Sequence, residues 1–135
     1  MTWYVSRRLP TPVDAAVGAL DRITGQGVIP CALPDVALGP TRVPIGRSPR
    51  SGPVRRVRGT LRLRGLGGTV PVEVELQAWS RRESEVGVRP VTRRPPTWRA
   101  DRYFDSVAQL LSELSDRLLL TVAAENRAEE LRRAS

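Results

Sequence analysis

The feature that most limits how this chain can fold is the segment from Val57 to Ala78, in which apolar residues alternate with others on both sides of a Gly-rich turn. Such alternation is typical of the two strands of a hairpin, each with one face toward a core. The register that we predict pairs Leu63 with Val70 and Leu61 with Val72. It keeps the apolar side chains of both strands on one face, whereas a slip by one residue would turn one set to water.

Composition narrows the classes of protein to consider. The chain has 135 residues, of which 40% are hydrophobic, and this is enough for one domain with a single core. It contains no histidine, which removes the Ser-His-Asp and Cys-His classes of catalytic site and the commonest metal ligand. The single cysteine, Cys31, excludes an internal disulfide, and we interpret it as a structural thiol. We therefore expect no catalytic residue, no metal and no cofactor.

Targeting and membrane-spanning signals are not evident in the sequence. The N-terminus has no apolar region of the kind found in signal peptides, and no apolar run is long enough to span a bilayer. We expect a cytoplasmic protein with no transmembrane segment.

The residues before the hairpin predict a strand, a short helix and a region rich in proline and glycine. The strand runs from Trp3 to Leu9, and the helix from Pro12 to Thr24, with Thr11 as its cap. The region that follows holds six Pro and five Gly up to Pro53, so strands within it must be brief. Two are expected, at Val36 to Leu38 and at Arg42 to Ile45. Residues 46–53 have nothing to bury, and we interpret them as a mobile basic loop.

The residues after the hairpin predict a turn from Trp79 to Glu83, a strand from Glu85 to Val91 and a long helix that begins near Asp101. Apolar residues follow one stripe of that helix: Phe104, Val107, Ala108, Leu111, Leu114, Leu118 and Val122. We expect a single α+β domain over residues 1–123, and a polar tail over residues 124–135 whose helix frays.

This order of elements is that of a helix-grip α+β domain, and the chain resembles a short member of the START-like or SRPBCC superfamily. That group includes polyketide cyclases, lipid-transfer proteins and pollen-allergen-like folds. Three segments carry the resemblance: TWYVSRRLPTPVDAAVGAL, VPVEVELQAWS and RYFDSVAQLLSELSDRLL. The resemblance implies a curved antiparallel sheet that grips a long C-terminal helix, with a short N-terminal helix after the first strand.

The resemblance also implies an apolar cavity between the sheet and the C-terminal helix. The chain would then be a non-enzymatic binding or carrier domain for an unidentified hydrophobic small molecule. The residues that would line the cavity are Leu61, Leu63, Val72, Val74, Leu76, Trp79, Phe104, Val107, Leu111 and Leu114. The residues themselves leave a second interpretation open, in which the aliphatic side chains pack directly together as a solid core and Trp79 packs at a turn.

Charge suggests an alternative function class. The formal net charge is +8, every basic residue is Arg, and the segment from Val36 to Val72 holds eight Arg and no acid. A basic scaffold or nucleic-acid-associated protein would bind polyanions through residues 42–64. The candidate residues are Arg50, Arg55, Arg56, Arg58, Arg62 and Arg64. Against this alternative, Glu73 and Glu75 neutralise part of the face, and the segment has no aromatic residue to stack on bases.

Overall fold

The computed structural model describes residues 3–25, 36–38, 55–63, 69–91 and 100–134 of the chain. These residues form two helices and five strands, in the order β1 (Val5–Leu9), α1 (Val13–Gly25), β2 (Val36–Leu38), β3 (Arg55–Arg62), β4 (Thr69–Ala78), β5 (Ser84–Pro90) and α2 (Ala100–Ala134).

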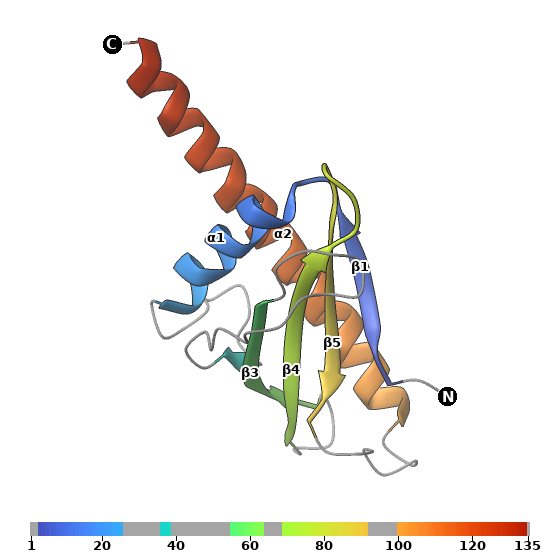
Figure 1. The fold of residues 1–135 in the computed structure, drawn as a ribbon. Helices are drawn as coiled ribbons and strands as arrows, with labels where there is room; N and C mark the ends of the chain where they lie inside the picture. Colours follow the sequence, from blue (N-terminus) through green and yellow to red (C-terminus); the bar gives the residue numbers. More distant parts are fainter. Residues whose placement is uncertain (1–2, 26–35, 39–54, 64–68, 92–99, 135) are drawn as a thin grey trace.

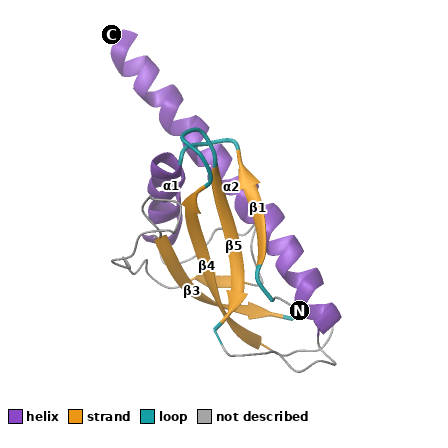
Figure 2. Cartoon of the chain, turned by 45° about the vertical axis from the view of Figure 1, so that its right-hand side comes forward, coloured by secondary structure: helices purple, strands orange, loops and turns teal. Residues whose placement is uncertain are grey.

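The strands form one antiparallel sheet in the order β1-β5-β4-β3-β2, so the first strand pairs with the last. Both helices pack on one face of this sheet, and α2 runs obliquely across it (Figure 1; Figure 2). The expected architecture, a curved antiparallel sheet that grips a long C-terminal helix, is confirmed.

The register of the central hairpin differs from the predicted one by two residues. Leu61 pairs with Val70, and Gly59 with Val72, so the predicted pairings of Leu63 with Val70 and of Leu61 with Val72 are wrong. A shift by two residues leaves every side chain on its predicted face, because side chains alternate with a period of two. Apolar patterning alone therefore does not distinguish these two registers.

Charge pairing favours the observed register. Arg56 lies opposite Glu75 and Arg58 opposite Glu73, whereas the predicted register placed only Arg58 directly opposite an acid, Glu75. The Arg56 Nε is 2.9 Å from the Glu75 carboxylate, and the Arg58 Nε is 3.6 Å from that of Glu73. Opposite charges that face each other across a hairpin stabilise it, so two facing pairs outweigh one.

The elements before the hairpin agree with the sequence prediction where the structure describes them. Helix α1 begins and ends within one residue of the predicted bounds, and its first hydrogen bond runs from the Ala16 amide to the Pro12 carbonyl. Strand β1 begins at Val5, two residues later than expected, and β2 lies at the predicted Val36–Leu38. The strand expected at residues 42–45 and the loop expected at 46–53 lie outside the described residues.

Helix α2 is longer than predicted, and its buried stripe keeps five of the seven predicted residues but is shifted toward Tyr103 and Leu110. It continues to Ala134, through the segment expected to be a fraying tail, and its end projects beyond the sheet (Figure 1). Ala108, which was placed on the stripe, is exposed, whereas Tyr103 and Leu110, which were not, are buried. The stripe turns toward Tyr103 because that ring packs edge-to-face on Trp3, with ring centroids 5.5 Å apart.

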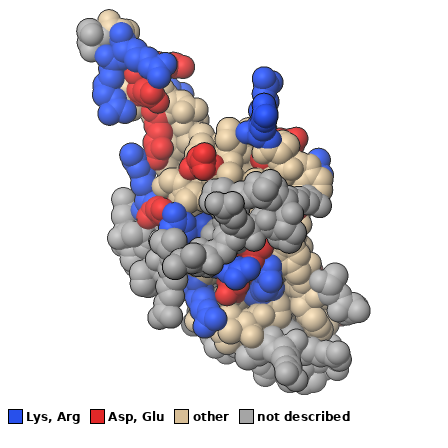
Figure 3. Space-filling view, in the orientation of Figure 1, with Lys and Arg blue, Asp and Glu red and all other residues tan. Residues whose placement is uncertain are grey.

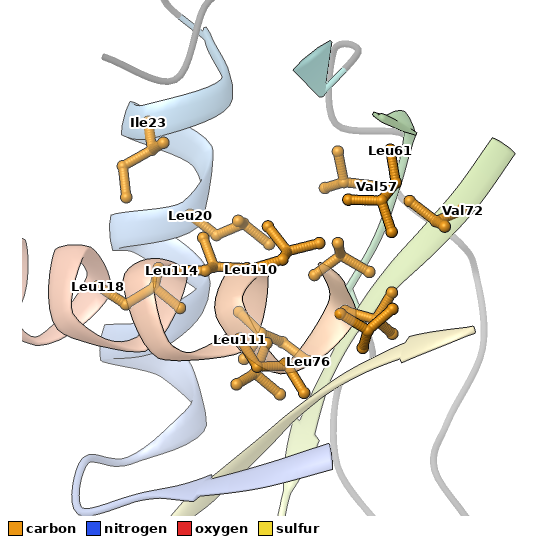
Figure 4. Close-up of a cluster of buried hydrophobic side chains, with 14 of the residues drawn as sticks. Leu20, Ile23, Val57, Leu61, Val72, Leu76, Leu110, Leu111, Leu114 and Leu118 are labelled. Carbon is orange, nitrogen blue, oxygen red and sulfur yellow. The ribbon is translucent and has the colours of Figure 1, made fainter. Parts of the chain in front are cut away.

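The core lies between the inner face of the sheet and the two helices, and Figure 4 shows part of it. Leu20 of α1 lies beside Leu110 and Leu114 of α2 in this cluster (Figure 4), which also includes Ile23 and Leu118. Most of the inward-facing apolar residues of the hairpin, α1 and β5 are buried here, and Val17 of α1 is partly buried against them. One contiguous core fits the single domain expected from chain length.

Candidate functional site

Eight of the ten residues predicted to line a cavity lie buried in this core. They are Leu61, Leu63, Val72, Val74 and Leu76 of the hairpin, and Val107, Leu111 and Leu114 of α2. The sheet residues come from alternate positions of β3 and β4 and from Leu63, which follows β3, and the helix residues lie one turn apart. These eight residues therefore belong to the two facing surfaces of the core.

The two predicted aromatic residues lie at the margins of this region. Phe104 is partly buried and stacks on Trp3, with an interplanar angle of 3°. Trp79 follows β4 in the turn to β5, where the guanidinium of Arg8 lies 3.8 Å from its ring centroid. Since Arg8 is exposed, this cation–π contact holds Trp79 at the surface rather than between the sheet and α2.

The facing surfaces carry few polar groups. Among the described residues, those buried on these surfaces include the serines Ser84, Ser106 and Ser115 and one ionisable residue, Tyr103. The Tyr103 hydroxyl donates a hydrogen bond of 3.1 Å to the Trp3 carbonyl, and burial raises the pKa of this phenol. No Asp, Glu or Arg of the described chain is fully buried there. Arg55, which has the same inward parity as Val57, is part-exposed and lies 3.4 Å from the Asp21 carboxylate of α1.

Two of those serine hydroxyls have no hydrogen-bond partner. The Ser84 Oγ and the Ser115 Oγ are both fully buried, and no described residue donates to or accepts from either. The sequence offered a signal for Ser115, because it lies four residues after Leu111 and three before Leu118, on the apolar stripe itself. Ser84 has the same parity as Val86 in its strand, which places it on the inner face.

The outer face of the sheet holds a network of charges that the sequence indicated only in part. The Glu75 side chain is 7% exposed and lies between two guanidinium groups, at 2.9 Å from Arg56 and 2.8 Å from Arg89. Next to it, the Tyr4 hydroxyl donates to the Glu85 carboxylate at 3.0 Å. Burial, and after it the Glu85 carboxylate, raises the pKa of Tyr4.

The predicted polyanion-binding residues are only partly within the described chain. Arg55, Arg56 and Arg58 each lie beside a carboxylate, that of Asp21, Glu75 and Glu73 respectively. The structure describes the backbone of Arg62 but not its side chain, and Arg50 and Arg64 lie outside the described residues. Arginines already paired with acids have less charge to offer to phosphates, which weakens the polyanion alternative.

A shallow open groove lies where the end of α1 meets the projecting part of α2. Its volume is about 310 Å³, and its lining residues are Arg22, Arg117, Leu120, Thr121, Ala124, Glu125 and Ala128. The Arg22 guanidinium lies 3.0 Å from the Glu125 carboxylate on its wall. Figure 3 shows basic and acidic side chains on the projecting end of α2. None of the predicted cavity residues lines this groove.

Neither a cluster of metal-ligating side chains nor a helix suited to span a bilayer occurs in the described part of the chain. It contains no group of three or more Asp, Glu, Cys or His side chains placed to hold a metal ion. None of its helices combines the length and the apolar character needed to cross a bilayer.

Comparison with known proteins gave matches among solved structures only. No family model matches the chain, and no curated protein matches it. A START superfamily protein from Mycobacterium smegmatis is 8% identical, with a TM-score of 0.46, over 87% of this chain and 96% of its own. The structure of Ara h 8.0201 is 14% identical, with a TM-score of 0.41, over 92% of this chain and 98% of its own.

A third structure is the Zhui aromatase/cyclase from Streptomyces sp. R1128, which is 11% identical, with a TM-score of 0.39, over 85% of this chain and 91% of its own.

Proposed function

We propose that this chain is a non-enzymatic binding or carrier domain for a hydrophobic small molecule, held between the inner face of the sheet and α2. The observation that carries the proposal is the chemistry of the two facing surfaces. Both are mainly aliphatic, and no charged side chain of the described residues is buried between them. Such surfaces bind ligands by removing apolar area from water, with little demand for a particular polar pattern.

The arrangement of the helices suggests where the ligand lies. Helix α2 packs mainly on β1, β5 and α1, and α1 packs on β4. Leu61 and Val72 lie on the opposite side of the buried cluster from Leu118 (Figure 4). We infer that the ligand lies on the β3 and β4 side of the sheet, between these two residues and Leu111 of α2.

The position of Tyr103 supports binding rather than catalysis. Its hydroxyl donates a hydrogen bond to the Trp3 carbonyl, so its proton is engaged within the protein and is less available to a substrate.

Uptake of an apolar fluorescent probe tests this proposal. The unmodified protein should enhance the fluorescence of the probe saturably. Val74→Phe or Gly59→Val should abolish this uptake while the variant stays folded, because each adds volume on the inner face. Thr60→Val is the matched control, since Thr60 is exposed and points to the other side of β3. It should leave uptake unchanged.

Two results together would contradict the carrier function. In a solid core, the unmodified protein would take up no probe, and the two filling substitutions would destabilise the fold by about 1 to 3 kcal/mol through overpacking. That pair of results would overturn the carrier function and leave the domain as a scaffold.

A further inference from the structure

Helix α2 continues well past its last contact with the core. Its last buried residue is Val122, and the helix runs on to Ala134. We call residues 123–134 the projecting end, which extends away from the sheet (Figure 1) and in which every residue except Glu125 is exposed. Helices in proteins obtain most of their stability from the packing of an apolar face, and the described chain offers the projecting end no such packing.

A second apolar stripe runs along this part of α2. It consists of four exposed residues at intervals of four, four and three positions: Leu120, Ala124, Ala128 and Leu131. We call them the outward stripe, because this spacing places them on one side of the helix. Leu120 is two residues from the buried Leu118 and Val122, which is about 200° around the helix, so the stripe faces away from the core. Both leucines of the stripe are exposed by about two thirds, at 67% and 68%.

The open groove at the junction of α1 and α2 lies on this stripe. Leu120, Ala124 and Ala128 are among the residues that line its volume of about 310 Å³. Alanines leave room for a large side chain from a facing helix, since bulky and small residues interdigitate where helices pack. The groove therefore fits a leucine of a second helix that lies along the outward stripe.

Charge indicates which helix can approach. The formal net charge of +8 makes two copies of the chain repel each other over most of their surface. The projecting end differs, because it holds three Glu and three Arg and has no net charge. Its side chains of both signs are visible in Figure 3. The groove also presents both signs, through Arg22, Arg117 and Glu125, so it can accept a second projecting end without like-charge repulsion.

We propose that the outward stripe binds a second copy of this chain. The two projecting ends pair antiparallel about a twofold axis, with Leu131 of each copy beside Leu120 of the other. Such a contact is self-complementary, as a twofold interface requires, because each copy supplies the same groove and the same leucine. The antiparallel direction also keeps the two basic domains at opposite ends of the helix pair, whereas a parallel pair would bring them together.

The proposed contact is small. The outward stripe extends over about 16 Å of helix, and two such stripes bury less than the roughly 1,200 Å² found in stable complexes. We therefore expect a weak, reversible dimer with a dissociation constant on the order of 100 µM.

Sedimentation velocity at protein concentrations from about 5 to 500 µM tests the dimer. The unmodified protein should shift from monomer to dimer over this range. Leu131→Asp and Leu120→Asp should each weaken dimerisation at least about tenfold, because each places a carboxylate in the apolar contact. Asn126→Asp is the matched control, since it adds the same charge to the projecting end on the side opposite the stripe. It should change the dissociation constant by less than about threefold.

Disulfide formation tests the direction of pairing. In a Cys31→Ser background, protein with Leu120→Cys would be mixed with protein with Leu131→Cys and oxidised. The antiparallel pair predicts mixed disulfides, because these two positions face each other. Two identical positions lie about 16 Å apart along the pair, beyond the roughly 7 Å between Cα atoms that a disulfide can bridge.

Four results would overturn the proposal. One is a protein that stays monomeric at every concentration, and another is a dimer that neither leucine substitution weakens. A third is equal weakening by Asn126→Asp, which would show that charge and not the leucine contact governs association. Disulfides between identical positions alone would contradict the antiparallel pair. If a monomeric protein instead bound vesicles of phosphatidylglycerol, and Leu131→Asp abolished this binding, the stripe would belong to a lipid surface and not to a second copy.

Discussion

Gly87 lies directly beneath the ring of Tyr4, and a β-carbon built at Gly87 would overlap that ring. The absence of a side chain at this position of β5 lets the ring lie flat across the outer face of the sheet. From there the Tyr4 hydroxyl reaches the Glu85 carboxylate, and the Arg89 guanidinium lies 4.8 Å from the ring centroid.

Gly87→Ala should therefore destabilise the fold by about 1 to 3 kcal/mol, because Tyr4 must move and lose both contacts. Chemical denaturation measures this change. In a Tyr4→Ala background the same substitution should cost much less, since the ring is gone. A cost that is equal in both backgrounds would show that Gly87 is needed for its backbone and not for the ring.

The Glu75 carboxylate is the buried centre of the charge network on the outer face. Glu75→Ala should destabilise the protein by about 2 kcal/mol, because it leaves the guanidinium groups of Arg56 and Arg89 without their shared partner. Arg58→Ala is the comparison, since the Arg58 side chain is 67% exposed and its pair with Glu73 should contribute less than about 1 kcal/mol. Equal effects of the two substitutions in urea denaturation would contradict the central place of Glu75.

The side of α2 that faces the core can be tested in the same way. Leu110→Ala should cost about 2 to 5 kcal/mol, as expected for a leucine that is almost fully buried. Ala108→Gln should be nearly neutral, because Ala108 is exposed. If the two effects were reversed, the helix would face the sheet with the stripe that we first predicted from sequence.

Both tyrosines of the chain, Tyr4 and Tyr103, have a pKa raised mainly by burial. Their ionisation is easier in the unfolded chain, whose tyrosines titrate near pH 10, so stability should fall as the pH rises above about 10. Spectrophotometric titration should show tyrosinate only as the protein unfolds. Reversible ionisation of a tyrosine near pH 10 in the folded state would contradict the burial of that side chain.

The sequence predicts which side chains of each strand and helix face the core, but it does not predict which residues pair across the β3–β4 hairpin. Alternation in Val57–Ala78 predicts which residues turn inward, and the same pattern is satisfied by registers two residues apart. The choice between them depends on Arg56, whose partner Glu75 is also held by Arg89 from the next strand. Such a three-strand network is not visible in a local pattern.

In the candidate site too, local patterns in the sequence predict the inward-facing residues but not the contacts between distant ones. The aliphatic residues of the facing surfaces follow from periodicity, because Leu61 and Leu111 occupy regular inward positions of a strand and a helix. Tyr103 was missed because its partner Trp3 is 100 residues away in sequence. Ser84 and Ser115 were missed because serine is usually exposed, whereas both are buried here.

Native mass spectrometry of protein purified without denaturation tests the central claim, ligand binding between the sheet and α2, most directly. The account predicts a population of the unmodified protein that carries one hydrophobic organic molecule, and loss of this population in Val74→Phe but not in Thr60→Val. The account would be contradicted if the unmodified protein showed only the mass of the bare chain and also took up no apolar probe added to it.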